Sequence, residues 1–430
     1  MNWVTSNTPA KLSRNEIVTA HPRRSADSEV PMTSQIDDLA ARTRAFIDAH
    51  VIPVEDEFDG DVAAAGGERL RIDLQRKARA EGVFAPHAPR EYGGHGLAMR
   101  ERAAVFEAAG RSLFGPMALN LNAPDEGNLH LLDQVASGAQ RERYLAPLAR
   151  GEQRSAFAMT EPPPGAGSDP NALRTLARRD GDGWLVNGRK KFITGADGAG
   201  FLIVMARTSG EPDSPGGATM FLVPAGHPGI RVLRHVNTMD KSMLGGHCEI
   251  ELADVRVGPE DVLGAVDEGF HYAQVRLGPA RLTHVMRWLG AAQRAHETAV
   301  RYVSERSGFG RPLAQHGMVE HMIADNEIDL AATRSLLLTA CEALDAGRAG
   351  REETSLAKVF GAEALHRVAD RAVQLCGGAG VSADLPTARI AREIRPFRIY
   401  DGPSEVHRMS LARRAVRRYG VPGERAQREP

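Results

Sequence analysis

The most informative stretch of this 430-residue chain is Gln374-Leu375-Cys376-Gly377-Gly378-Ala379-Gly380-Val381-Ser382-Ala383-Asp384, which is followed by Arg389 and Glu393. Its glycines permit positive φ angles and a close approach of the backbone to a neighbouring group. The spacing is not Gly-x-Gly-x-x-Gly after a strand, so a Rossmann dinucleotide site is not indicated. Taken alone, the stretch predicts a turn between two helices, for which an ordinary helix C-cap is the simpler interpretation.

Helical patterns lie on both sides of this turn. Apolar residues recur at three- and four-residue steps over 282–302, 319–344 and 356–375, and a basic helix is expected over 408–419. Long helices without intervening strands predict a helical bundle over residues 270–420. Residues 34–155 also show helical periodicity and form a predicted N-terminal α-helical domain.

The segment between these helical parts has a different pattern. Short apolar runs at 201–205, 220–223 and 248–252 are separated by Gly, Pro and Asp, which predicts a middle antiparallel β domain over 156–269. Asn187-Gly188, flanked by apolar runs, predicts a two-residue hairpin. The fold class is therefore α+β, with helical domains at both ends of the chain and a β domain between them.

The two ends of the chain differ from the rest. Residues 1–33 are polar and aperiodic and are expected to be a disordered extension, with Met32 as an alternative start of translation. Residues 421–430 form a predicted C-terminal tail.

Composition excludes several classes of protein. Lys and Arg total 54 against 55 Asp and Glu, so the net charge of −1 gives no field that would attract nucleic acid. Three cysteines without Cys-x-x-Cys spacing argue against a disulfide framework or a zinc site and favour a cytoplasmic location. His316 and His321 do not share a helix face, so no metal site is expected. No run of 18 apolar residues is present, so no membrane-spanning helix is expected.

Three further stretches carry residues that could hold a ligand. Residues 158–169 combine hydroxyls, glycines and prolines, whose exposed N–H groups could bind an anionic or heterocyclic ligand, although a plain connector is equally compatible. Tyr400-Asp401-Gly402-Pro403-Ser404-Glu405 places an acid ahead of a helix, as a simple cap also would. Residues 306–312 read alone as a helix end.

Together these four stretches resemble signatures of the acyl-CoA dehydrogenase family over residues 34–420. The resemblance implies an N-terminal α domain, a middle β domain and a C-terminal four-helix bundle, in a homotetramer or dimer. It also implies FAD between β domain and bundle, shared with a neighbouring subunit. The implied substrate is an acyl-CoA, and the implied electron acceptor is an electron-transfer flavoprotein.

The resemblance assigns roles residue by residue. Met159 and Thr160 are expected to contact the flavin pyrimidine, and Ser168 to meet FAD phosphate or the pantetheine of the substrate. One face of the flavin is expected to be covered by Phe192, Ile193 and Thr194, with the Thr194 hydroxyl near N5. The other implied cofactor-binding residues are Arg306, Phe309, Gln374, Gly377 and Gly378, which serve the partner subunit, and Pro403 and Glu405. The implied substrate-binding residues are Ser168, Arg281, Tyr400 and Gly402.

The catalytic base is the main departure from the family pattern. The α-proton of a thioester is weakly acidic, so a carboxylate must remove it while a hydride leaves the β-carbon for flavin N5. Most members have Glu where this chain has Asp401, and a minority place the base at the position of Ala280. Asp401 is therefore the expected base, and Glu405, a helical turn further on, is the fallback.

The expected reaction is FAD-dependent α,β-dehydrogenation of an acyl-CoA to trans-2-enoyl-CoA. The branch with this motif set includes enzymes that act on 4-hydroxyacyl-CoA, so chain length and hydroxylation stay open. One alternative is a flavin oxidase or monooxygenase on the same fold, similar to nitroalkane oxidases. A DNA-binding relative is a second alternative, which the net charge opposes.

Overall fold

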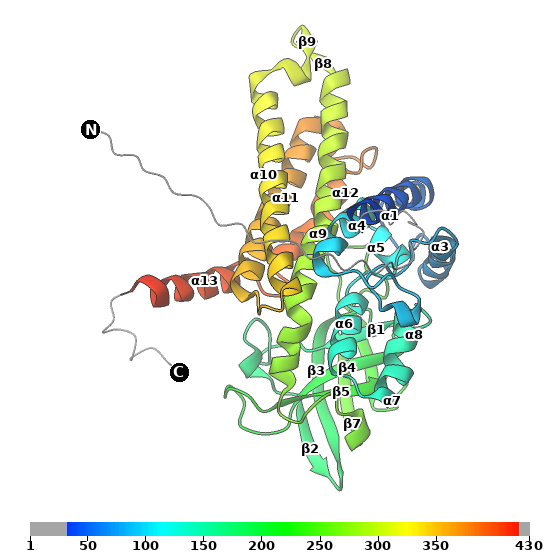
Figure 1. Ribbon diagram of the computed structural model, residues 1–430, viewed down its shortest axis with the longest axis vertical. Helices are drawn as coiled ribbons and strands as arrows, with labels where there is room; N and C mark the ends of the chain where they lie inside the picture. Colours follow the sequence, from blue (N-terminus) through cyan, green and yellow to red (C-terminus); the bar gives the residue numbers. More distant parts are fainter. Residues whose placement is uncertain (1–31, 421–430) are drawn as a thin grey trace, which may run out of the picture.

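The computed structural model describes residues 32–420 and divides into three parts (Figure 1). Short helices of the N-terminal half lie beside a cluster of long helices, and a β domain lies below both. The predicted extension 1–33 and the tail 421–430 lie outside the described residues, except that the first helix begins at Met32.

The N-terminal part is helical, as predicted. Two short π-helical turns, η1 (Ile47–Val51) and η3 (Arg141–Leu145), follow α1 and α7 directly. The α-helices of this part are α1 (Met32–Phe46), α2 (Ile52–Glu57), α3 (Glu68–Ala80), α4 (Met99–Gly110), α5 (Gly115–Ala118), α6 (Asp125–Val135), α7 (Gly138–Gln140) and α8 (Ala146–Ala149).

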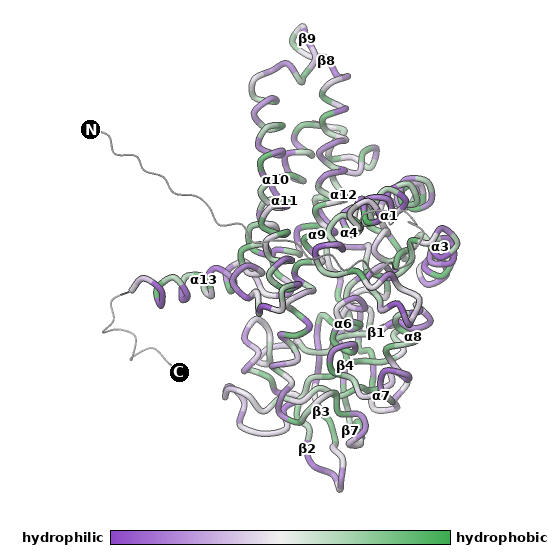
Figure 2. The backbone as a smooth tube through the Cα atoms, viewed as in Figure 1, coloured by the Kyte–Doolittle hydropathy of each residue, from purple (hydrophilic) through white to green (hydrophobic). Residues whose placement is uncertain are grey.

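The middle part is a seven-stranded sheet with the order β1-β4-β2-β3-β7-β6, in which β5 also pairs with β4. Most pairings are antiparallel, as predicted, but β4 pairs in parallel with both β1 and β2. β4 and β5 are almost completely buried and form hydrophobic runs in Figure 2. The strands are β1 (Ser155–Ala158), β2 (Leu176–Asp180), β3 (Gly183–Thr194), β4 (Phe201–Arg207), β5 (Ala218–Pro224), β6 (Ile230–His235) and β7 (His247–Val257).

The hairpin predicted at Asn187-Gly188 is wrong. Both residues lie inside β3, and the hairpin that joins β2 to β3 turns at residues 181–182 instead. The pairing of β3 with β7 shifts register between Val186 and Gly188, which marks a β-bulge. A Cβ on Gly188 would lie 2.5 Å from the Thr175 hydroxyl oxygen, so the glycine here permits close packing rather than a turn.

The C-terminal part contains the three long helices that the periodicity predicted: α9 (Gly269–Glu305), α10 (Gly317–Asp345) and α11 (Arg351–Gly380). They pack against one another, and α12 (Thr387–Ile394) packs on α11 and α9 as the fourth helix. A hairpin of β8 (Ser307–Gly308) and β9 (Arg311–Pro312) caps the far end of the bundle, and α13 (Ser404–Tyr419) projects sideways (Figure 1).

The glycine-rich stretch 374–384 is not a simple turn between two helices. α11 runs through it as far as Gly380, and Gly377 interrupts the helical geometry with φ 56° and ψ −132°. These angles are available to glycine and are rarely adopted by other residues.

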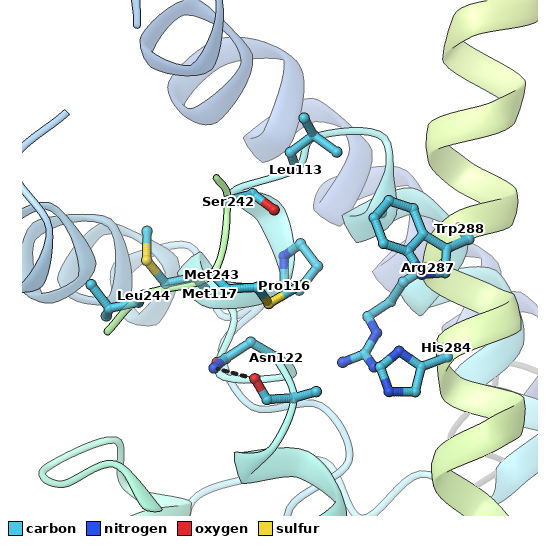
Figure 3. A pocket seen from close by; sticks show the side chains of 12 residues that line it. Leu113, Pro116, Met117, Asn122, Ser242, Met243, Leu244, His284, Arg287 and Trp288 are labelled. Carbon is cyan, nitrogen blue, oxygen red and sulfur yellow. Dashed lines mark hydrogen bonds between the residues drawn. The ribbon is translucent and has the colours of Figure 1, made fainter. Parts of the chain in front are cut away.

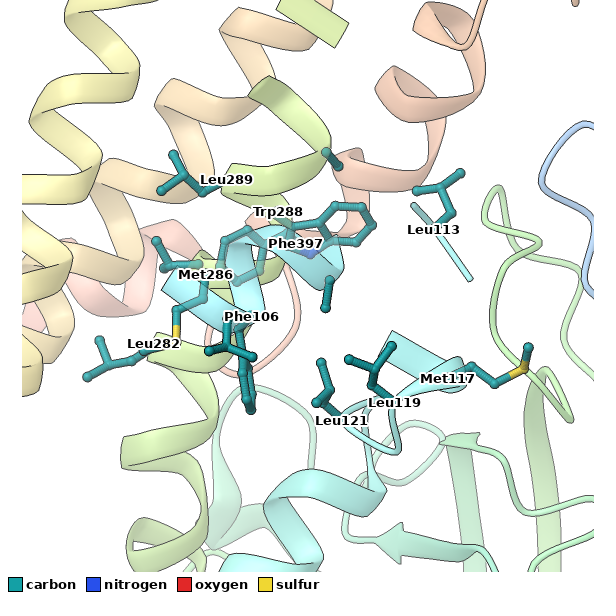
Figure 4. Packing of buried hydrophobic residues seen from close by; sticks show 14 of the residues in the cluster. Phe106, Leu113, Met117, Leu119, Leu121, Leu282, Met286, Trp288, Leu289 and Phe397 are labelled. Atoms are coloured by element: carbon teal, nitrogen blue, oxygen red, sulfur yellow. The ribbon is translucent and has the colours of Figure 1, made fainter. Parts of the chain in front are cut away.

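The N-terminal helices, the bundle and one face of β4 and β5 share one hydrophobic core, and the other face of the sheet contributes to a second. Figure 4 shows Phe106 of α4 close to Met286 of α9, with Trp288 and Phe397 in the same cluster. The two helical parts therefore behave as one packed body, on which the β domain is mounted.

A buried carboxylate strengthens this union. Glu55 of α2 is fully buried and accepts hydrogen bonds from the Ser112 hydroxyl at 2.6 Å, from Arg294 of α9 at 2.9 Å and from Arg389 of α12 at 2.9 Å. Removing one partner of such a buried pair costs about 3–5 kcal/mol. Glu55 thus ties the N-terminal helices to two helices of the bundle.

Candidate active site

The turn before α13 presents Asp401, the expected base. Asp401 and Gly402 both have positive φ, at 54° and 97°. Asp401 Oδ2 lies 3.3 Å from His284 Nε2, and this oxygen accepts no well-aligned hydrogen bond from the described residues. Arg281 Nε donates to the Asp401 carbonyl at 2.8 Å, so this guanidinium, expected to bind CoA, also holds the backbone of the base. Oδ2 therefore keeps the capacity to take a proton.

His284 is the nearest partner of the base and was not singled out from the sequence. Arg287 Nη2 donates to His284 Nδ1 at 2.9 Å, which assigns the remaining proton to Nε2, the nitrogen that faces Asp401. Burial lowers the pKa of His284 to about 4, and the charge of Arg287 adds to this effect. In this neutral imidazole Nδ1 already accepts a hydrogen bond and Nε2 carries the proton, so His284 has no free lone pair with which to abstract a proton. His284 therefore influences Asp401 rather than serving as the base itself.

The electrostatic surroundings keep Asp401 ionised. Burial alone would raise the pKa of Asp401. The polar contact with His284, together with the charges of Arg276 and Arg281, outweighs this and holds the pKa well below the ordinary range of an aspartate. The free enzyme therefore carries a carboxylate here at neutral pH.

A second cation fixes the turn that carries the base. Lys358 of α11 is fully buried and donates from Nζ to the carbonyls of Phe397 and Gly402, at 2.8 Å each. Burial lowers the pKa of Lys358 to about 8. One ammonium group thus joins the two ends of the turn around Asp401.

A pocket opens in front of His284 and Arg287 (Figure 3). It lies where all three parts of the chain meet. Its polar residues are Asn122, Ser242, His284 and Arg287, and its other lining residues are Gly110, Leu113, Pro116, Met117, Ala123, Met243, Leu244 and Trp288. A mainly apolar pocket with a few polar groups at one side suits an acyl chain with a polar end.

The residues expected at the flavin are brought together at the ends of β1 and β3. The Thr160 hydroxyl donates to the Lys191 carbonyl at 2.6 Å, and the Lys191 N–H donates to the Thr160 carbonyl at 2.9 Å. Phe192 has φ 60° and is 54% exposed, so its ring is available to a ligand. The side chain of Ile193 is fully buried in the β-domain core, so only its backbone can face the flavin.

A buried ion pair shapes the loop behind these residues. Lys190 Nζ contacts the Met159 carbonyl at 3.1 Å and Glu161 Oε1 at 2.9 Å, and both side chains are almost completely buried. The Glu161 carboxylate also accepts from the backbone N–H groups of Ala166 at 3.1 Å and Arg174 at 2.8 Å. Glu161 therefore gathers the connector 161–175, while Ser168 stays exposed at its surface.

Comparison with known proteins decides the family. Three family models match in order: the N-terminal domain of acyl-CoA dehydrogenases over 33–152, the middle domain over 156–255 and the C-terminal domain over 267–416. The chain belongs to the acyl-CoA dehydrogenase family. Like other acyl-CoA dehydrogenases, it is an oxidoreductase.

Individual relatives agree with this membership. The chain is 37% identical over 397 residues to the probable acyl-CoA dehydrogenase FadE2 of Mycobacterium tuberculosis, covering 90% of this chain and 97% of that protein. It is 34% identical over 428 residues to mouse acyl-CoA dehydrogenase family member 11, covering 95% of this chain but 54% of that longer protein. The structure of butyryl-CoA dehydrogenase from Megasphaera elsdenii superposes with a TM-score of 0.80 at 27% identity, covering 90% of this chain and 100% of that one.

The remaining residues expected at FAD lie elsewhere on this acyl-CoA dehydrogenase. Phe309, 97% exposed, and Arg306 lie at the β8–β9 tip, far along the bundle from the β domain (Figure 1). Gln374 is exposed on α11, and added Cβ atoms at Gly377 and Gly378 would meet open space. A single chain does not bring these five residues to the site formed by Thr160 and Phe192.

The first turn of α13 does not supply a second base next to Asp401. Glu405 is exposed in the first turn of α13. Tyr400, by contrast, turns inward, where its hydroxyl accepts from Trp288 Nε1 at 2.5 Å. Of the two acids considered from the sequence, only Asp401 is partly buried and in contact with His284 and Arg281.

Residues 32–420 contain neither a membrane-spanning helix nor a metal-ligand cluster. None of the helices in this span combines the length and the apolar character needed to cross a membrane. Nor do three or more His, Cys, Asp or Glu side chains of this span come together as ligands for a metal ion.

Proposed function

We propose that this acyl-CoA dehydrogenase converts an acyl-CoA to trans-2-enoyl-CoA, with Asp401 taking the α-proton and FAD taking the β-hydride. The observation that carries the proposal is the partly buried, ionised Asp401 carboxylate next to His284 at the pocket, with an oxygen that accepts no well-aligned hydrogen bond from residues 32–420. FAD is the cofactor, and it supplies the hydride acceptor that protein side chains lack.

The site residues fit FAD as the resemblance assigns it. The exposed Phe192 ring offers an apolar wall, and the hydroxyls of Thr160 and Thr194 lie at the same end of the sheet. Met159, Ser168 and the backbone of Ile193 complete this half of the proposed cofactor site. Arg306, Phe309, Gln374, Gly377 and Gly378 are proposed to complete the site of a neighbouring subunit in a homotetramer, since one chain holds them apart.

The residues around the base have distinct proposed tasks. Arg281 and Lys358 hold the backbone of the turn through hydrogen bonds to the carbonyls of Asp401 and Gly402. This fixed backbone orients the Asp401 side chain, which is shorter than the Glu of most family members. His284 and the arginines keep the carboxylate ionised before substrate binds. Entry of an apolar acyl chain removes water from Asp401, which raises its pKa and makes it a stronger base when the α-proton must leave.

The substrate is proposed to be an acyl-CoA whose chain fills the pocket in front of His284 and Arg287. Asn122, Ser242 and Arg287 could bind a hydroxyl on that chain, which supports testing 4-hydroxyacyl-CoAs. Arg281, Ser168, Tyr400 and Gly402 are the proposed contacts to the CoA-bearing end, and Pro403 and Glu405 adjoin the cofactor. An electron-transfer flavoprotein in the cytoplasm is the proposed acceptor.

The test is anaerobic flavin bleaching of the holoenzyme by a panel of straight-chain and 4-hydroxyacyl-CoAs. Asp401→Asn removes the base without changing its size, and a loss of at least ~100-fold in bleaching rate is expected, with FAD still bound. Glu405→Gln, at the fallback position, is expected to bleach much faster than Asp401→Asn. Full bleaching by the Asp401→Asn variant would refute the assignment, and rapid reoxidation by air with release of peroxide would identify an oxidase instead.

A further inference from the structure

A carboxylate, an imidazole and a hydroxyl form a continuous chain at the end of β3 and β7. Thr194 and His247 are direct cross-strand partners in the β3–β7 ladder, so their side chains share a face. Thr194 Oγ1 lies 2.9 Å from His247 Nδ1, and His247 Nε2 lies 2.7 Å from Asp240 Oδ2. The side chains of His247 and Asp240 are 16% and 7% exposed.

The far end of this chain is fastened to the helical bundle. Glu393 of α12 accepts hydrogen bonds from the Lys241 N–H at 2.6 Å and from the Ser242 hydroxyl at 2.7 Å, directly after Asp240. The segment that positions Asp240 is therefore held by a different part of the chain from the strands that carry Thr194 and His247.

The hydrogen-bond directions follow from the chemistry of the three groups. Burial would raise the pKa of Asp240, but its hydrogen bond with His247 holds it below the usual value, so Asp240 is an acceptor. His247 then donates from Nε2, which leaves Nδ1 as an acceptor in the neutral imidazole. Thr194 donates its only proton to Nδ1, so the remaining lone pairs of its oxygen can accept a proton from a neighbouring group.

We infer that Thr194, His247 and Asp240 form a proton relay that takes the N5 proton from the reduced flavin when its electrons leave. The inference rests on the proposed placement of FAD against Thr194. Substrate oxidation delivers a hydride to the flavin and a proton to Asp401. Reoxidation passes two electrons to a one-electron acceptor and releases one proton from flavin N5.

The proton balance closes within the three side chains. The N5 proton moves to Thr194 Oγ1 as the hydroxyl proton of Thr194 moves to His247 Nδ1. The resulting imidazolium is stabilised by the Asp240 carboxylate through Nε2–H. The relay acts in the half-reaction that Asp401 does not serve.

The experiment uses holoenzyme reduced with dithionite and reoxidised anaerobically by ferrocenium, so no acyl-CoA is needed. Failure of the proposed substrate reaction is therefore distinguishable from failure of the relay. The variants are His247→Ala, Asp240→Asn and Thr194→Val, and His235→Ala is the matched control. His235 lies on the neighbouring strand β6, with an exposed side chain paired to Asp197.

Reoxidation is expected to slow about 10- to 100-fold in the three relay variants and to stay unchanged in the control, as for loss of a positioned proton acceptor. Free imidazole is expected to restore the rate of His247→Ala but not of Thr194→Val. The FAD content and visible spectrum of His247→Ala are expected to match those of the unaltered enzyme. Equal reoxidation rates, failure of imidazole to rescue, or loss of FAD from both His247→Ala and Asp240→Asn would overturn the relay.

Discussion

Replacing Glu393 by Gln should make the enzyme more stable at neutral and alkaline pH. Glu393 is 1% exposed, and burial, with a contribution from the charge of Asp240, raises its pKa to about 7 from an ordinary 4.5. Between these two values the folded state binds more protons than the unfolded state, so stability falls as the pH rises from 4.5 to 7. The difference corresponds to about 3 kcal/mol at about 1.36 kcal/mol for each pH unit.

Gln resembles the protonated carboxyl group, since it keeps one acceptor for the Lys241 N–H and presents a donor toward Ser242. The Glu393→Gln variant should therefore match the unaltered enzyme near pH 4.5 and exceed its stability by up to about 3 kcal/mol above pH 7. Thermal denaturation across this pH range measures the effect. Because a change of about 1 kcal/mol moves the midpoint by about 2–4 °C in domains of about 150–250 residues, a rise of several degrees at about pH 8 is expected.

The matched control is Glu305→Gln, which changes an exposed glutamate at the end of α9. Its midpoint should follow that of the unaltered enzyme at every pH. If Glu393→Gln and the unaltered enzyme lose stability in parallel between pH 4.5 and 7, Glu393 is already ionised in the folded state and the reasoning fails.

Further predictions concern the base and the flavin wall. Lys190→Met leaves the buried Glu161 carboxylate without its cation and should lower the free energy of unfolding by about 3–5 kcal/mol. Adding Glu161→Gln in the double variant should restore part of this loss. An unchanged melting temperature of Lys190→Met would contradict the importance of the pair. Lys358→Met should slow anaerobic bleaching about 100-fold with FAD retained, because the turn around Asp401 loses two hydrogen bonds; a normal rate would show that the turn holds without them. His284→Phe removes the polar contact between His284 Nε2 and Asp401 Oδ2 and should raise the pKa of Asp401, which moves the acid limb of kcat/KM to higher pH. An acid limb that does not move would leave His284 with a packing role alone.

The sequence was sufficient for the architecture, because long helices have a strong period. The patterns over 282–302, 319–344 and 356–375 correspond to α9, α10 and α11, and the basic segment 408–419 lies within α13. Local turn chemistry was less reliable. Asn187-Gly188 has the composition of a hairpin, but long-range pairing of β3 with β7 and the close approach of Thr175 favour a bulge.

The candidate site likewise contains residues that local sequence reveals and residues that only the packing reveals. Asp401 could be found from its motif, and the structure surrounds it with Arg281 and His284. His284 and Lys358 could not be found, because their importance depends on packing between segments that are distant in the chain. One local signal existed for His284: it follows Arg281 by three residues, so the two lie on neighbouring positions of one helix face.

The same dependence on distant segments explains the missed relay. Asp240 and His247 lie in a stretch without a recognisable motif, and only the register of β3 against β7 places His247 opposite Thr194. Ile193 shows the opposite case. It sits inside a motif, yet strand alternation turns its side chain into the β-domain core.

The carboxylate of Glu55 constrains how a substrate can reach the pocket. It is bonded at once to Ser112, Arg294 and Arg389, so the N-terminal helices cannot hinge away from α9 and α12 without exposing or stranding a buried charge. The pocket wall made by Ser242, Met243 and Leu244 belongs to a loop of the β domain, and Glu393 of α12 ties this loop to the same helices through the Lys241 N–H and the Ser242 hydroxyl. Two buried acidic side chains therefore hold the pocket walls together, so widening the pocket would break hydrogen bonds to one of them.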